Sequence, residues 1–245
     1  MLSKRVIPVL LLDDGYLVKT INFDEPKYIG DPINAVRIFN EKEVDEIILI
    51  DINSSKKKSG PDFELLNDLA SECFMPVTYG GGISKIKHIK KLFYTGVEKV
   101  TLNQACISNF DLISEASKVF GSQSIIYAVD VIKKNNQYFI YDYLNKTILG
   151  DPMKSLIDAE KFGAGEVFVN LVNLDGTMSG YDIKFFNDLS KSISIPIIAC
   201  GGAGSIDDIE SLFNQTDISA AAAGSLFVFK GRHRAVLITY PKFNI

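Results

Sequence analysis

The sequence repeats itself at a fixed offset of 120 residues. Residues 76–82 read PVTYGGG and residues 196–202 read PIIACGG, so that 196 − 76 = 120. The same offset relates Gly30-Asp31-Pro32 to Gly150-Asp151-Pro152. A constant offset maintained over most of a chain indicates one structural unit used twice, which restricts the architectures open to it.

Segments typical of strands and helices alternate along both halves. The apolar run 6–12 is typical of a strand buried on both faces. The pairs Asp31-Pro32 and Asp151-Pro152 fit helix starts, because Asp caps a helix well and Pro suits its first position. We predict an α/β fold, a single (β/α)8 TIM barrel, whose half-barrel repeats are approximately residues 1–122 and 123–245. A doubly wound open sheet is the alternative, and it gives no reason for two similar halves.

The predicted elements locate the chemistry, because active sites of such barrels lie at the carboxyl ends of the strands. We interpret the residues between the first strand and Asp31 as a long loop, and we expect a short closing helix after Leu226. A hairpin insert is expected at 137–143 and 146–149. The eight predicted strands are residues 6–12, 46–50, 77–79, 99–102, 125–131, 166–171, 195–199 and 220–223.

Composition excludes several classes of function. The net charge of −4 argues against a nucleic-acid-binding surface, which would be basic. The first apolar run is too short for a membrane span and lacks a signal-peptide cleavage pattern. Three cysteines without paired spacing fit reduced thiols, and His88 and His233 are too far apart to suggest a metal site. We expect a cytoplasmic protein that uses no metal and no cofactor.

Glycine-rich turns follow the third and seventh predicted strands, and each precedes a helix. Backbone N–H groups in such turns and helix N-termini favour anions. Gly224-Ser225 adds a helix start beside the second turn, which is the usual phosphate site of these barrels. Tight turns without a ligand are the plainer interpretation, but two turns at the repeat offset favour a phosphate-containing small molecule. The predicted phosphate-binding residues are Gly81, Gly82, Asn103, Gln104, Asp175, Gly176, Gly202, Gly224 and Ser225.

Single charged residues at the same end are further candidates. Asp130 ends the fifth strand and is a candidate general acid or base, with a loop cap or salt-bridge partner as the plainer interpretation. Lys19, in the long first loop, is a candidate phosphate clamp or a solvated side chain. Lys56-Lys57-Lys58 fits an exposed loop.

Charged residues also mark the opposite end of the barrel. Arg5, Glu46, Lys99 and Glu166 stand at the starts of strands one, two, four and six. Two acids and two bases pointing into the bottom of the bore could form a ring of ion pairs. Such a ring is either a structural plug or a gate, and the residues alone do not decide between them.

Together these residues resemble the HisF-like cyclase subunit of imidazole glycerol phosphate synthase over nearly the whole chain. The resemblance implies a duplicated half-barrel that binds a bisphosphate ribonucleotide derivative. It also implies a glutaminase that docks on the N-terminal face and sends ammonia through the bore. It identifies the charged ring with an ammonia gate, and Gln104 stands where threonine is usual. The matching segments are 4–8, 14–15, 19, 22–23, 30–32, 80–82, 130, 163–166, 175–180 and 201–204.

The sequence departs from that family at the first strand. The family uses two aspartates as its acid and base; one matches Asp130, and the other falls at Leu11. A leucine cannot transfer a proton, and a positioned acid or base supplies ~10²–10⁴-fold in rate. We therefore expect the cyclase reaction to be impaired. Asp13 shares the strand parity of position 11 and is a candidate substitute, although it lies ~6–7 Å further along the strand.

Residues 7–12, 18–20 and 234–241 more closely resemble a divergent branch tied to acetamidino modification of bacterial surface sugars. There the barrel serves a glutaminase and a separate sugar amidotransferase. The resemblance thus implies an ammonia-channelling subunit. A true cyclase of histidine biosynthesis and a monofunctional phosphosugar isomerase are the alternatives.

Overall fold

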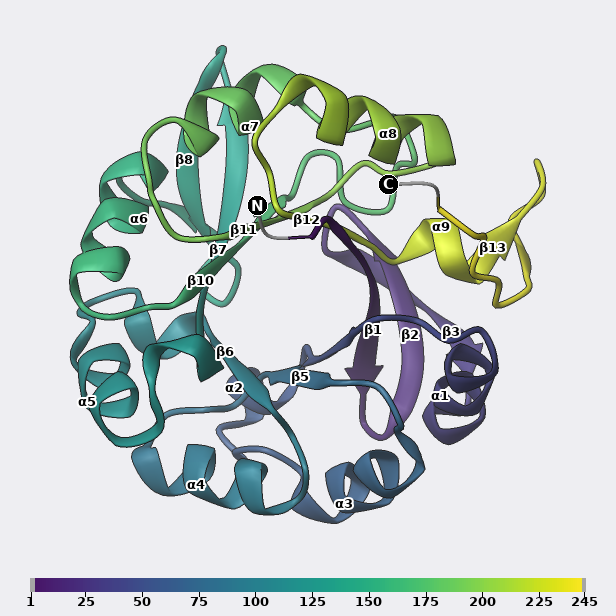
Figure 1. Ribbon diagram of the computed structural model, residues 1–245, viewed down its shortest axis with the longest axis horizontal. Helices are drawn as coiled ribbons and strands as arrows, with labels where there is room; N and C mark the ends of the chain where they lie inside the picture. Colours follow the sequence, from purple (N-terminus) through teal and green to yellow (C-terminus); the bar gives the residue numbers. More distant parts are fainter. Residues whose placement is uncertain (1–2, 244–245) are drawn as a thin grey trace.

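Eight parallel strands close into a barrel in the computed structural model, which describes residues 3–243 (Figure 1). The interior of the barrel, which packed side chains fill, is called the bore. β7 pairs with β10 and β12 pairs with β1, so the sheet has no open edge along this ring. The predicted (β/α)8 barrel is confirmed. Its strands are β1 (Arg5–Asp13), β4 (Ile47–Asp51), β5 (Val77–Gly80), β6 (Lys99–Leu102), β7 (Ile125–Lys134), β10 (Glu166–Leu171), β11 (Ile197–Cys200) and β12 (Ala220–Ala223).

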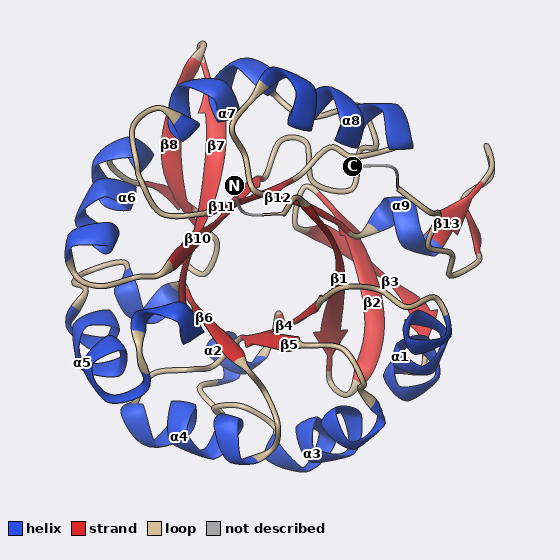
Figure 2. Cartoon of the chain, in the orientation of Figure 1, coloured by secondary structure: helices blue, strands red, loops and turns tan. Residues whose placement is uncertain are grey.

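Helices surround the barrel on its outside (Figure 2). Asp31 caps the first of them by accepting a hydrogen bond from Asn34 N, and Asp151 caps its counterpart through Met153 N. These caps lie 151 − 31 = 120 residues apart, as do the caps Asp62 and Asp182. The helices are α1 (Pro32–Glu41), α2 (Ser54–Lys57), α3 (Phe63–Glu72), α4 (Ile86–Tyr94), α5 (Asp111–Phe120), α6 (Pro152–Lys161), α7 (Ile183–Ser190), α8 (Ile206–Gln215) and α9 (Ser225–Val228).

Two hairpins extend the sheet at the carboxyl ends of β1 and β7. β8 (Gln137–Asp142) and β9 (Thr147–Ile148) form the insert expected from the sequence. The interpretation of the residues before Asp31 as a loop was wrong, because β2 (Tyr16–Ile21) pairs antiparallel with β1 and β3 (Asp24–Gly30) with β2.

Smaller elements also differ from expectation. The closing helix α9 begins at Ser225, one residue before Leu226. Lys56 and Lys57 belong to the short helix α2. Two short strands near the C-terminus were not predicted, β13 (Phe229–Lys230) and β14 (Ala235–Val236). The 3-10 turns Gln104–Cys106 and Ser122–Ser124 were not predicted either.

Alternate residues of the barrel strands supply two apolar layers, because successive side chains point to opposite faces. One layer joins the strands to the helices and contains Phe39, Leu66 and Phe186. The other fills the bore and is described below. Burying one such side chain contributes ~1.5–3 kcal/mol. No helix within residues 3–243 is long and apolar enough to cross a bilayer.

Candidate functional site

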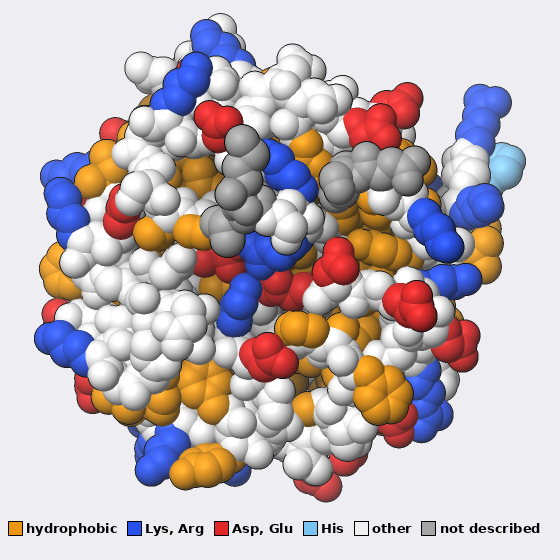
Figure 3. All heavy atoms as spheres, in the orientation of Figure 1, with side chains coloured by type: hydrophobic (Ala, Val, Ile, Leu, Met, Phe, Trp, Pro, Cys, Tyr) orange, Lys and Arg blue, Asp and Glu red, His pale blue; other side chains and the backbone are white. Residues whose placement is uncertain are grey.

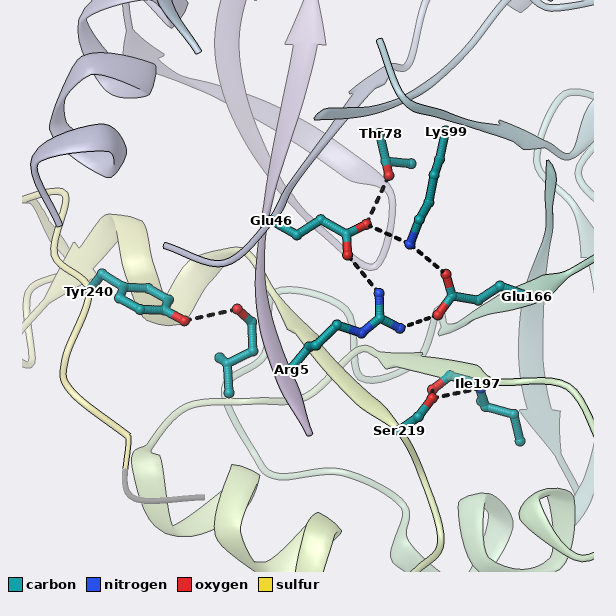
Figure 4. Close-up of polar contacts among 9 residues, drawn as sticks. Arg5, Glu46, Thr78, Lys99, Glu166, Ile197, Ser219 and Tyr240 are labelled. Carbon is teal, nitrogen blue, oxygen red and sulfur yellow. Dashed lines mark hydrogen bonds and ion pairs between the residues drawn. The ribbon is translucent and has the colours of Figure 1, made fainter. Parts of the chain in front are cut away.

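A closed ring of ion pairs lies at the amino-terminal end of the bore (Figure 4). Arg5 Nη1 lies 2.6 Å from Glu46 Oε2, and the other guanidinium nitrogen pairs with Glu166. Lys99 Nζ lies 3.4 Å from Glu46 Oε1 and 3.1 Å from Glu166 Oε2. Thr78 Oγ1 donates a further hydrogen bond of 2.9 Å to Glu46. Each carboxylate therefore contacts both cations, and the four residues singled out from the sequence meet.

The ring is largely removed from water. The side chains of Glu46 and Glu166 are 5% and 6% exposed, whereas those of Arg5 and Lys99 are 22% and 23% exposed. Burial acts to lower the pKa of Arg5, but the two glutamates outweigh it and raise this pKa above its ordinary value. The ring thus carries balanced and mutually satisfied charge.

Above the ring the bore is apolar. Its lining is a cluster separate from the outer core, and three of its largest members are Ile48, Ile126 and Phe168. Leu11 and Ile50 pack against its upper end. An apolar interior of this kind is a poor environment for an ion, because transfer of a charge out of water is costly.

The bore opens into a cavity at the carboxyl ends of the strands. The cavity has a volume of about 1080 Å³, including its mouth, and Leu11 and Asp130 both line it. β1 and β7 are four strands apart in the ring of eight, so these two residues lie on opposite walls. An aliphatic side chain therefore faces the carboxyl group of Asp130 across the cavity.

Asp130 is 8% exposed. Burial raises its pKa to about 7, the nearby acids Asp175 and Asp142 add to this, and a hydrogen bond from Asn103 opposes it. Asn103 Nδ2 donates that bond to Oδ2 over 2.9 Å. At neutral pH the carboxyl group is therefore present in both protonation states, which suits proton transfer or hydrogen-bond donation.

Asp13 does not line the cavity. It stands at the end of β1, and its carboxylate accepts a hydrogen bond from the Asn53 side chain. Asp13 lies two residues beyond Leu11 on β1, outside the part of the strand that lines the cavity. The candidate substitution of Asp13 for the missing acid finds no support in this geometry.

Lys19 lies in the strand β2, not in a loop, and is 8% exposed. Its Nζ donates to Val9 O over 3.3 Å and lies where a Cβ at Gly224 would be, 1.8 Å from that built position. Burial lowers the pKa of Lys19, and the charge of Asp175 opposes this. The ammonium group thus reaches the predicted phosphate position at Gly224, and a residue larger than glycine would displace it.

Among the other predicted phosphate positions of the second half, Asp175 lies near Lys19. Asp175 lines the cavity and accepts a hydrogen bond from Thr20 Oγ1 over 3.4 Å. Gly202 has φ +111°, and a Cβ there would lie 2.0 Å from Gly180 O. Gly176 has φ +71° and lies against the backbone of β2. The loops therefore require glycine at both places, with or without a ligand.

The four predicted phosphate positions of the first half, Gly81, Gly82, Asn103 and Gln104, all line the central cavity. A second hollow of about 940 Å³ lies at the start of α4. Gly82 and Gln104 line both this hollow and the central cavity. Gly82 N donates to Ser55 Oγ over 3.1 Å, and Gln104 Nε2 donates to Asp142 Oδ1 over 3.3 Å. Lys58, interpreted from the sequence as part of an exposed loop, also lines this hollow, and sequence reasoning missed Lys85 and His88.

The tips of the two hairpins meet at the cavity. Phe23 follows β2, Tyr143 follows β8, and both line the cavity wall. Their ring centroids are 6.4 Å apart with an interplanar angle of 90°. The two residues are 143 − 23 = 120 positions apart, a correspondence that the repeat offset could have revealed. Among residues 3–243 no group of three or more His, Cys, Asp or Glu side chains is arranged to hold a metal.

Known proteins resemble this chain in sequence along nearly their whole length. Residues 5–234 match the histidine biosynthesis protein family. The chain is 48% identical over 246 residues to a Pseudomonas aeruginosa protein provisionally named imidazole glycerol phosphate synthase subunit hisF2, covering 100% of this chain and 98% of that protein. It is 38% identical over 247 residues to imidazole glycerol phosphate synthase subunit HisF of a Hydrogenobaculum species, covering 100% and 98%.

A Leptospira interrogans protein with the provisional name of HisF subunit is 43% identical over 245 residues, covering 98% of this chain and 96% of that protein. The resemblance drawn from the sequence is thereby confirmed at the level of the family. This chain belongs to the histidine biosynthesis protein family and is HisF-like in sequence.

Proposed function

We propose that this barrel conducts ammonia from a glutaminase, docked at its amino-terminal face, to a sugar amidotransferase that amidinates a bacterial surface sugar in the cytoplasm. The observation that carries the proposal is the contrast within one bore. The ring at its entrance is complete, whereas Leu11 stands on the cavity wall opposite Asp130. A conduit needs the ring and the apolar passage, but it does not need a pair of proton-transferring carboxylates.

The amino-terminal face has features that suit a protein partner. Phe74, which precedes β5, is 91% exposed, and Tyr94 at the end of α4 is 80% exposed. Phe162 after α6 is 43% exposed. Figure 3 shows hydrophobic side chains spread around charged side chains of both signs near the centre of one face. Exposed aromatic residues are enriched at interfaces, which fits a glutaminase seated over the ring.

The test combines the barrel with its glutaminase and the sugar amidotransferase and measures amidinated sugar formed per glutamine consumed. Glu46→Ala or Lys99→Ala opens the ring and should lower this ratio severalfold. Lys184→Ala, an exposed lysine on α7, is the matched control and should leave it unchanged. Full coupling in both ring variants would rule the proposal out.

The cyclase of histidine biosynthesis is the second candidate, because Asp130 with a pKa of about 7 and the glycine turns of both halves are present. Growth of a histidine auxotroph that carries this chain and a glutaminase would favour that function. The absence of growth, together with coupled amidination, would favour the conduit. A monofunctional phosphosugar isomerase would bind no glutaminase and would tolerate the ring variants.

A further inference from the structure

The last segment of the chain has a charge opposite in sign to that of the rest. Residues 218–245 contain four of the 26 lysines and arginines and none of the 30 acidic residues, so the first 217 residues have a net charge of −4 − 4 = −8. Three of the four, Lys230, Arg232 and Arg234, lie within five positions. None of these three forms an ion pair with a described residue. A local excess of one charge indicates a surface that attracts a partner of opposite charge.

The three basic residues belong to a short hairpin that is anchored to the barrel. β13 and β14 pair antiparallel, and Arg234 N closes the turn by donating to Gly231 O over 3.0 Å. Phe229 at the base is buried in the outer core, and Leu237 N donates to Val228 O over 2.8 Å. β13 projects beyond the ring of helices (Figure 1), and Lys and Arg side chains gather on this projection (Figure 3). Because the hairpin is held at its base, a partner would lose little free energy in ordering it.

The hairpin lies beside the cavity, at the end of the barrel opposite the ring of ion pairs. Arg234 Nη2 donates to Thr177 O over 3.2 Å. Thr177 belongs to the loop after β10, and Asp175 of the same loop lines the cavity. On the other side, Lys27 of β3 places its Nζ 5.6 Å from the centroid of the Phe229 ring. The hairpin therefore adjoins two of the segments that surround the mouth of the cavity.

Apolar side chains accompany the charges. Val236 is 44% exposed and Leu237 is 50% exposed. A nucleic acid would leave these two side chains without a role, and so few cations would contact few phosphates. Neither the central cavity nor the second hollow is lined by a residue of this hairpin, which disfavours a small anionic ligand. Arginine together with exposed apolar side chains is typical of protein interfaces.

We propose that the β13–β14 hairpin is the docking surface for the enzyme that receives ammonia at the carboxyl-terminal end of the barrel, and that this enzyme presents an acidic surface to the hairpin. This inference rests on the proposed function and assigns the surface that the sugar amidotransferase contacts. The first 217 residues, with their net charge of −8, repel an acidic surface, whereas the hairpin attracts it. The partner is thereby directed to one side of the cavity mouth, and Val236 and Leu237 supply the apolar contact.

The first experiment measures binding of the purified barrel to the purified sugar amidotransferase by biolayer interferometry. Arg232→Glu reverses an exposed charge and should lower the association rate about tenfold at about 0.1 M salt. The difference should nearly vanish at about 1 M salt, where the Debye length is about 3 Å. Lys154→Glu is the matched control, an exposed lysine on α6 across the barrel from the hairpin (Figure 1), and should bind as the wild type does. Unchanged melting temperatures would show that both variants are folded.

The apolar part of the surface has a separate signature. Leu237→Ser removes an exposed side chain but keeps the backbone hydrogen bond to Val228 O. It should raise the dissociation rate severalfold and leave the association rate almost unchanged, because loss of a short-range contact acts mainly on dissociation. An effect of Leu237→Ser on neither rate would contradict the apolar contact.

The outcomes separate the docking surface from the proposed function. Equal binding by wild type and Arg232→Glu would overturn the surface alone, and a wild-type barrel that does not bind the amidotransferase would overturn both. Full coupling in the ring variants, with binding still sensitive to Arg232→Glu, would overturn the proposed conduit and retain the surface. The surface would also be overturned if Arg232→Glu kept its affinity for the amidotransferase and lost affinity for the glutaminase, a DNA duplex or phosphatidylglycerol vesicles.

The second experiment measures amidinated sugar per glutamine consumed at increasing concentrations of barrel. Arg232→Glu should lower this ratio severalfold at low concentration and should reach the wild-type value at saturation, because a docking residue affects assembly and not passage through the bore. A ratio that stays low at every concentration would contradict a role in docking.

Discussion

The two ends of the bore treat buried charge in opposite ways. At the amino-terminal end every carboxylate of the ring contacts two cations, and the cations remain partly exposed. At the carboxyl-terminal end, Lys19 has one hydrogen bond to a backbone carbonyl. Asp130 there has a single amide partner. Charged groups that pair with one another stabilise the fold, whereas charged groups without a partner of opposite charge are available to bind a ligand.

The largest effect should come from making the upper end more like its cyclase relatives. Leu11→Asp places a second carboxyl group opposite Asp130. If the rest of the cyclase site is intact, the cyclase rate should rise by ~10²-fold or more, the usual contribution of a positioned acid or base. The measurement is steady-state formation of imidazole glycerol phosphate with ammonium salts as nitrogen source. Leu11→Asn, which places a side chain of similar shape without an acid at the same position, serves as the control, and equal rates in both variants would refute the expectation.

Breaking the lower end should reduce stability more than removing a charge from the upper end. Glu166→Gln deprives Arg5 and Lys99 of a partner, and loss of one member of a buried ion pair costs about 3 kcal/mol or more. Urea unfolding at pH 7 measures the change. Asp130→Asn, which removes a buried charge without a cationic partner, should be neutral or stabilising under the same conditions. The reverse order of the two variants would contradict the contrast.

The pH dependence of stability should report Asp130. Burial raises its pKa in the folded protein to about 7, above the ordinary value of 3.8, so the folded state holds the proton more tightly. Its contribution to stability is complete below pH 4 and is lost as the pH rises to 7, by up to ~4 kcal/mol at ~1.4 kcal/mol for each pKa unit. Asp130→Asn should flatten this part of the curve. Parallel curves for variant and wild type from pH 4 to 8 would count against the raised pKa.

The smallest expected effect concerns the hairpin tips above the upper end. Phe23 and Tyr143 meet edge to face, and such pairs contribute ~0.5–1.5 kcal/mol beyond the area that they bury. A double-mutant cycle with Phe23→Leu and Tyr143→Leu, followed by urea unfolding, should give a coupling energy of this size. A coupling near zero would show that the tips do not hold each other in solution.

The sequence was sufficient for the barrel and for the ring, but not for the walls of the cavity. The offset of 120 residues and the charged residues at strand starts depend on local pattern, which sequence carries directly. Lys19 was misjudged because its burial results from pairing of β2 with β1, and the Asp14-Gly15 turn that makes this pairing was overlooked. Asp-Gly is a common two-residue hairpin turn, with positive φ at both positions as found here. The place of Asp13 depends on where the cavity ends, which strand parity does not reveal.

The turn between β2 and β3 has one more consequence. Asn22 and Phe23 both have positive φ, +52° and +65°, in a two-residue connection where the second position favours glycine. A bulky side chain in this conformation costs ~1–2 kcal/mol. The backbone at Phe23 is thus strained while its ring contacts Tyr143. Separation of the two hairpin tips would release part of this strain energy. Separation of the two rings should therefore cost less free energy than the aromatic contact alone implies.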